Sequence, residues 1–205
     1  MKTFKIFGFV LAASALLTSC VGDDDTTLPN YTPYLIGEDF TGPADNTILE
    51  IEGWQNVASQ GTAVWKNQIF SGNNYAEFSS FQSGEAVNVG WLITPGVNLD
   101  ATEGEVLGFD VSQSFVSDAA NKLEVLVSTD YDGNAANIAT ATWQPLNANI
   151  PGPSAVYFEF QESGAIDLSS YTGTAYIAFR VTGSGTNSSL DGSYQIDNVR
   201  ISYQN

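Results

Sequence analysis

The chain has no histidine, and its 205 residues include only one cysteine, Cys20. Without imidazole, the Ser-His-Asp and Cys-His forms of nucleophilic catalysis are excluded, as are zinc sites that depend on histidine ligands. A lone cysteine also excludes an internal disulfide. An enzyme built from this chain would therefore have to use carboxylates, tyrosine or lysine, and we expect a protein that is not an enzyme.

Cations are also scarce, with 6 Lys and Arg residues against 23 Asp and Glu residues and a formal net charge of -17. Loss of an N-terminal segment that contains Lys2 and Lys5 would change this charge to -17 - 2 = -19. Such a charge repels nucleic acid and anionic lipid surfaces, so we expect no nucleic-acid partner. Divalent cations and neutral ligands are better candidates, although acidity can also serve solubility alone. The cations that remain are Lys66, Lys122, Arg180 and Arg200.

The N-terminus has the pattern of a secretory signal. Lys2 and Lys5 precede an apolar run from Ile6 to Leu17 that is too short to cross a bilayer as a helix. Leu17-Thr18-Ser19-Cys20 resembles the bacterial lipobox, which implies cleavage before Cys20 and acylation of that cysteine. One acyl chain holds a protein to a membrane only marginally, whereas several hold it firmly. The other interpretation is an ordinary secretory signal that leaves no anchor.

We predict three parts: a lipoprotein signal peptide at 1–19, the acylated cysteine with a flexible tether at 20–33, and one β domain at 34–205. The tether is rich in Asp, Thr, Pro and Asn and has almost nothing to bury. Its Asp23-Asp24-Asp25 triplet resembles the acidic export tag of Bacteroidetes lipoproteins. That resemblance implies an outer-membrane lipoprotein that faces the cell exterior, whereas a solvated charge run in a linker is the alternative.

From Tyr34 onward, apolar and polar residues alternate in many short segments, such as 107–111, 123–128 and 177–181. A period of two is typical of half-buried antiparallel strands. Clusters of Gly and Asn separate these segments, and no window sustains helical spacing. The sequence therefore predicts an all-β fold, an antiparallel β-sandwich.

Seven stretches in this order resemble the choice-of-anchor J domain, which is similar to the cleaved adhesin domains of gingipains. The resemblance implies a jelly-roll β-sandwich carried on surface and secreted proteins of Bacteroidetes. It supports a binding or adhesion role without naming a ligand. The stretches are Glu38–Phe40, Gly53–Trp54, Gly90–Pro95, Leu123–Asp130, Ile166–Tyr171, Ile177–Arg180 and Ile196–Val199.

Two carboxylates occupy strand positions that, by alternation, lie on the same face as core residues. Asp197 shares its parity with Val199 and Ile201, and Glu38 shares its parity with Ile36. A buried carboxylate must be protonated, paired with a cation or bound to a metal. Related jelly rolls hold a structural Ca²⁺ between the first and last strands.

We therefore predict a structural Ca²⁺ site at Glu38 and Asp197, completed by Asp39 or Asn198 and backbone carbonyls. Two alternatives stay open. A bulge could turn Asp197 outward, because Ile196 has the opposite parity. A salt bridge to one of the two arginines, Arg180 or Arg200, could also neutralise Asp197.

Aromatic side chains are where a sugar ring could pack. Burial is the better interpretation for each of the four tryptophans, since large aromatics dominate sandwich cores. Trp65 and Trp143 lie in strands that alternate with polar residues, so the pattern does not decide which face of the sheet they occupy. Tyr131 is expected on a loop tip. We take Tyr131, Trp143 and Trp65 as the candidate ligand-binding residues.

The function that these patterns favour is a non-enzymatic, surface-anchored binding or adhesion module for a glycan or a partner protein. The alternatives are a small extracellular carbohydrate-active hydrolase or lyase, and a structural accessory lipoprotein of an outer-membrane uptake assembly. An exposed pair of aromatics on one sheet face or loop end would favour glycan binding. Two acids about 5 to 9.5 Å apart in a cleft would favour hydrolysis.

Overall fold

The computed structural model describes residues 32–204. Predictions that fall on residues 1–31, including the signal peptide, Cys20 and the acidic triplet, lie outside the described residues. No helix in the described part of the chain is long and apolar enough to cross a membrane. Its only helical segments are two 3-10 turns, η1 (Leu99–Ala101) and η2 (Ala135–Asn137).

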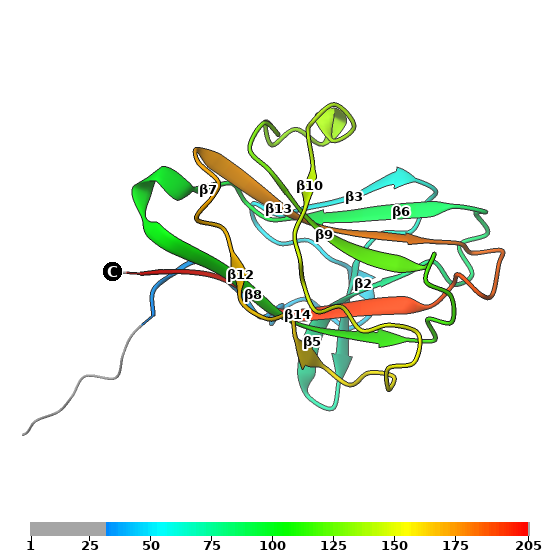
Figure 1. The fold of residues 1–205 in the computed structure, drawn as a ribbon. Helices are drawn as coiled ribbons and strands as arrows, with labels where there is room; N and C mark the ends of the chain where they lie inside the picture. The colour runs from blue at the N-terminus through cyan, green and yellow to red at the C-terminus, as the bar shows by residue number, and fades with distance from the viewer. Residues whose placement is uncertain (1–31, 205) are drawn as a thin grey trace, which may run out of the picture. The chain divides into compact units, whose positions relative to one another are not determined.

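Two antiparallel sheets form a jelly-roll β-sandwich, which confirms the predicted fold class. Figure 1 shows them as two layers. The first sheet has the order β11 (Gln161–Glu162), β8 (Glu103–Ser114), β14 (Ser193–Gln204), β5 (Asn73–Ser79), β4 (Lys66–Phe70), β2 (Thr47–Ile48), with β1 (Tyr34–Glu38) paired to β14 and β12 (Ile166–Asp167) paired to β8. The second sheet has the order β10 (Gln144–Pro145), β9 (Lys122–Ser128), β13 (Thr174–Gly183), β6 (Asn88–Ile93), β3 (Gln55–Gln60), with β7 (Val97–Asn98) paired to β13.

The main core lies between the sheets and follows from the alternation of the long strands. On β8, Leu107, Phe109 and Val111 are buried in the core cluster. The ring of Phe109 meets that of Phe179 on β13 edge to face, with 5.0 Å between centroids. Fully burying one such side chain contributes about 1.5–3 kcal/mol. These contacts fix the sheets against each other, so the outer faces are placed by the core.

The outer face of the second sheet carries a smaller apolar cluster under the loop that holds η2 (Figure 1). The ring of Trp143 lies 5.3 Å from the rings of both Trp91 and Tyr131. The guanidinium of Arg180 stands 5.1 Å over the Trp91 ring. This loop therefore covers the part of the outer face around Trp91.

The outer face of the first sheet is different, because its central strands present polar side chains. After β10 the chain crosses from the second sheet to the first, through a stretch that we call the crossing segment (residues 146–160) (Figure 1). The amide of Phe158 donates to the Gln113 carbonyl (2.9 Å), and Gln113 Nε2 donates to the Ala155 carbonyl (2.8 Å). These bonds hold the crossing segment beside the end of β8.

Candidate functional site

A polar floor runs across β5, β14 and β8 on the outer face of the first sheet. The register pairs Gln195 with Glu77 on one side and with Ser112 on the other. Gln195 Nε2 donates to Glu77 Oε2 (2.7 Å), and the Ser112 hydroxyl donates to Gln195 Oε1 (2.8 Å). The hydroxyls of Ser114 and Ser193 are 2.7 Å apart. The floor is therefore pre-organised, because its side chains fix one another.

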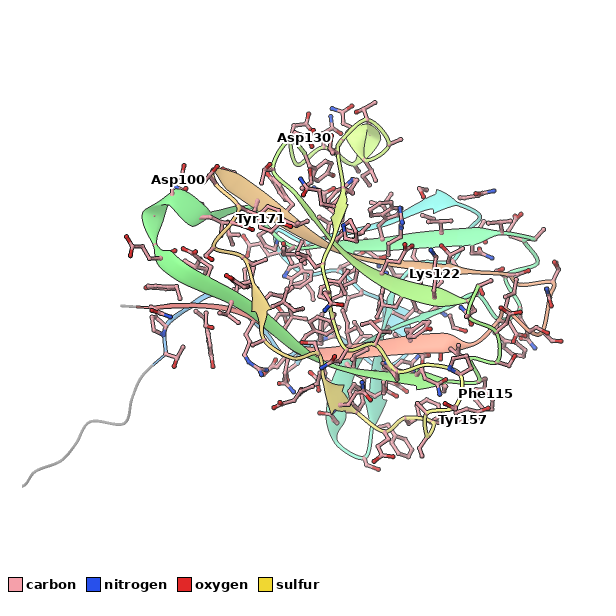
Figure 2. The ribbon with its side chains drawn as sticks, in the orientation of Figure 1. Asp100, Phe115, Lys122, Asp130, Tyr157 and Tyr171 are labelled. Carbon is pink, nitrogen blue, oxygen red and sulfur yellow. The ribbon has the colours of Figure 1, made fainter. Side chains whose placement is uncertain are left out.

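Exposed aromatic rings stand beside this floor. Phe115 is 61% exposed and Tyr157 is 46% exposed. Their ring centroids are 4.8 Å apart, and Figure 2 shows them side by side. Phe81 and Phe158 are exposed as well. Grouped apolar exposure of this kind marks interaction sites, whereas scattered single residues do not.

Rings and floor together line a groove of about 520 Å³. We call it the aromatic groove, and its lining residues are Glu77, Ser79, Phe81, Ser114, Phe115, Tyr157, Phe158, Ser188, Asp191 and Ser193. Glu77 and Phe158 also line a second hollow of about 250 Å³, together with Gln68, Phe70 and Tyr75. The 520 Å³ volume of the aromatic groove suits a small organic ligand.

Two groove aromatics have strained backbones. Phe115 and Phe158 have φ values of 59° and 60°, in the left-handed region that bulky residues avoid. Each such residue costs of order 1–3 kcal/mol and persists only where its surroundings determine it. The chain therefore holds both rings in place against a local preference, which is the behaviour of a pre-organised site.

The predicted metal-binding corner has a different geometry from the one expected. Asp197 is only 4% exposed, but it faces the outer side of the first sheet. The reason is a bulge at Asn198, whose φ is 50°, so that Ile196 and Val199 both point into the core. The inward orientation expected for Asp197 was wrong, and the bulge alternative is the one observed.

Asp197 is held by hydrogen bonds. Its Oδ2 accepts from Asn73 Nδ2 (3.0 Å), and its Oδ1 accepts from the Asn198 amide (2.6 Å). Burial raises the pKa of Asp197, the two hydrogen bonds oppose this shift, and the charges of Asp110 and Asp39 add to it. The carboxylate therefore lies in a site that disfavours its charge.

The other predicted calcium ligands, Glu38, Asp39 and Asn198, line a pocket of about 380 Å³ beside β1. Burial raises the pKa of Glu38, although its hydrogen bond from the Phe40 amide opposes the shift. Within residues 32–204, however, no three acidic groups converge closely enough to hold a metal ion. The hydrogen bonds that hold Asp197 would have to rearrange before its oxygens could join a calcium shell.

The salt-bridge alternative for Asp197 is not observed either. In the part of the chain that the structure describes, both ion pairs involve Glu124, which meets Lys122 at 3.0 Å and Arg180 at 2.8 Å. Arg200 donates to the carbonyl of Asn198 (3.3 Å). No arginine therefore neutralises Asp197.

Two of the three predicted ligand-facing aromatics are not available to a ligand. Trp65 is fully buried in the main core, 5.8 Å from the Phe78 ring. Tyr131 is 4% exposed and packs with Trp143 in the cluster outside the second sheet. Trp65 and Tyr131 therefore have no free face for a sugar, whereas Trp143 is half-buried, with its ring against Trp91 and Tyr131.

Sequence reasoning missed the aromatics of the groove. Phe115 and Tyr157 lie outside the alternating strands, in segments where periodicity gives no face. One signal was present: Val156, Tyr157 and Phe158 form an apolar run in an irregular stretch that begins after Pro151 and Pro153. Such a run in a segment that belongs to no sheet indicates exposure.

No family model and no curated protein matches the chain. Solved structures do share its fold. The K1 cleaved adhesin domain of Lys-gingipain from Porphyromonas gingivalis W83 is 21% identical with a TM-score of 0.50, over 83% of this chain and 98% of that one. The K3 domain from the same organism is 19% identical with a TM-score of 0.52, over 83% and 99%. The K2 domain of Lys-gingipain is 15% identical with a TM-score of 0.51, over 82% and 98%.

Proposed function

We propose that the chain is a non-enzymatic binding module whose aromatic groove holds a glycan. The observation that carries this proposal is the exposed Phe115–Tyr157 pair beside a polar floor. Sugar rings present C–H faces that pack on aromatic rings, and their hydroxyls both donate and accept hydrogen bonds. The groove offers both kinds of contact within one hollow. The similarity in fold to adhesin domains is consistent with a binding role and does not name the ligand.

A glycan array with the purified full-length protein tests this proposal. We expect binding to at least one class of oligosaccharide, and loss of that binding when the floor is altered by Gln195→Ala. Thermal unfolding of the variant is the control for its fold. A uniformly blank array would contradict the glycan proposal and leave adhesion to a protein as the function to test.

Hydrolysis is the competing activity, because two acids, Glu77 and Asp191, line the groove. Glu77 Oε2 accepts from both Gln195 and Ser193, at 2.7 and 3.2 Å, which ties it into the floor. We propose a structural role for this carboxylate. Release of reducing ends from any bound glycan during prolonged incubation would contradict that role.

We propose further that Cys20 anchors the module to the outer membrane, facing the cell exterior, and that the chain is a lipoprotein of the choice-of-anchor J type. The lipobox and the acidic triplet support this. Cys20→Ser is expected to move the protein from the membrane fraction to the soluble fraction, and protease added to intact cells should digest the wild type. Retention of the variant in the membrane would contradict the anchor.

Structural calcium is a separate proposal, for the corner formed by Glu38, Asp39, Asp197 and Asn198. Its support is a carboxylate that is almost fully buried and has no cationic partner among residues 32–204. The present hydrogen bonds would have to rearrange to build an oxygen shell. Chelation is expected to lower the melting temperature, and an unchanged melting temperature would contradict the proposal.

A further inference from the structure

The charges around the aromatic groove are all of one sign. Glu77 lies in its floor and Asp191 on its rim, and no lysine or arginine lines the groove or the adjoining hollow. A groove with two carboxylates and no cation imposes a constraint on the charge of its ligand.

The four cations of the described domain are occupied elsewhere. Lys122 and Arg180 pair with Glu124 on the second sheet, and Arg200 donates to the Asn198 carbonyl. Lys66 is the cross-strand neighbour of Glu77, but its Nζ donates to Asn46 Oδ1 (3.2 Å), and within residues 32–204 it forms no ion pair with Glu77. In this arrangement no lysine or arginine lines the groove to receive a ligand carboxylate or sulfate.

We infer that the aromatic groove selects glycans without negative charge and that Glu77 and Asp191 impose this selection. The inference rests on the proposed function and deepens it. A uronate or sulfate group entering the groove would lose its hydration and meet two like charges at short range. A hexose or pentose unit of the same shape meets no such penalty, because the serine side chains that line the groove suit neutral hydroxyls.

Matched pairs of oligosaccharides test this selection in the full-length protein. Each pair shares a backbone and differs in charge, for example β-glucan with glucuronan, mannan with mannuronan, and xylan with glucuronate-branched xylan. We expect the neutral member to bind at least tenfold more tightly at low salt. The gap should narrow as added salt screens the repulsion, since the Debye length falls to about 8 Å at physiological ionic strength.

The double variant E77Q/D191N tests whether the preference for neutral oligosaccharides arises in the groove. We expect the ratio of the affinity for the neutral member to that for the acidic member to fall at least fivefold. This holds even if the affinity for the neutral member also changes. E50Q/E52Q is the matched control, because it changes the net charge equally at exposed acids that line a different hollow, beside Trp54. Its ratio should stay at the wild-type value.

The outcomes separate the two claims. Equal or tighter binding of the acidic members would overturn the charge selection and leave glycan binding intact. The same holds if the control variant lowers the ratio as much as E77Q/D191N does, since the repulsion would then come from the net charge of the whole domain. If no member of any pair binds, the proposed function falls, and the inference with it.

Discussion

At the residue scale, Asp197 shows how a strand can bury a carboxylate without placing it in the core. The bulge at Asn198 turns the side chain to the outer face, where Asn73 and the Asn198 amide donate to it. Two hydrogen bonds reduce the cost of burial but do not remove it, because desolvation is the largest effect on the pKa of Asp197 and the charges of Asp110 and Asp39 add to it. The residue therefore makes the stability of the fold depend on pH.

The sign of that dependence follows from the raised pKa of Asp197. Folding favours the protonated form, so the contribution of this group is fully present below its unfolded pKa of about 3.9 and is lost as the pH rises through the folded value. With chelator present, we expect the wild type to lose stability relative to Asp197→Asn as the pH rises from about 4. Denaturant unfolding of both proteins at several pH values measures this. A difference that stays constant, or one that moves in favour of the wild type, would contradict the assignment.

At the scale of elements, β6 and β5 meet across the core at Gly90 and Phe78. A Cβ on Gly90 of β6 would overlap the ring of Phe78, which is fully buried. We expect Gly90→Ala to destabilise the domain by about 1–3 kcal/mol, the usual cost of overpacking a core. Chemical denaturation measures the change in the free energy of unfolding.

Gly152→Ala is the matched control for that substitution, because no atom lies within 4 Å of the added methyl group and the backbone is not in the left-handed region. Its stability should be close to that of the wild type. Equal losses in both variants would show that backbone freedom, and not the contact with Phe78, makes Gly90 necessary.

The long strands could be predicted from the sequence and the groove could not, for a physical reason. On β8, β9 and β13 the apolar residues of the main core alternate with outer-face residues that include Asp110, Glu124 and Arg180, so the sequence shows a period of two. Asn198 breaks that period through a positive φ that asparagine tolerates, and the parity argument for Asp197 failed there. Phe115 and Tyr157 lie in irregular segments whose position depends on contacts distant in sequence. The calcium site at Glu38 and Asp197 stays a prediction, although the bulge changes the face of the sheet from which Asp197 would reach a metal.

At the scale of the whole molecule, the two outer faces of the sandwich differ in how they are covered. The loop with η2 covers part of the outer face of the second sheet with an apolar cluster, whereas the first sheet keeps an open hollow beside the crossing segment. The net charge of -17 adds a general repulsion of anions to the local repulsion in the groove. A lipid anchor at Cys20 would leave such a domain free to meet neutral ligands at the cell surface.

The measurement that tests the central claim most directly is a calorimetric titration of the full-length protein with the strongest glycan from the array, compared with the Phe115→Ala/Tyr157→Ala double variant. Loss of a dominant aromatic contact costs about 2 kcal/mol, and each 1.4 kcal/mol is about tenfold in affinity. We expect at least a tenfold loss of affinity with unchanged thermal unfolding, whereas Tyr34→Ala, which removes a similarly exposed tyrosine at the start of β1, should bind like the wild type. Full affinity in the double variant would contradict the account, because the ligand would then bind elsewhere on the molecule.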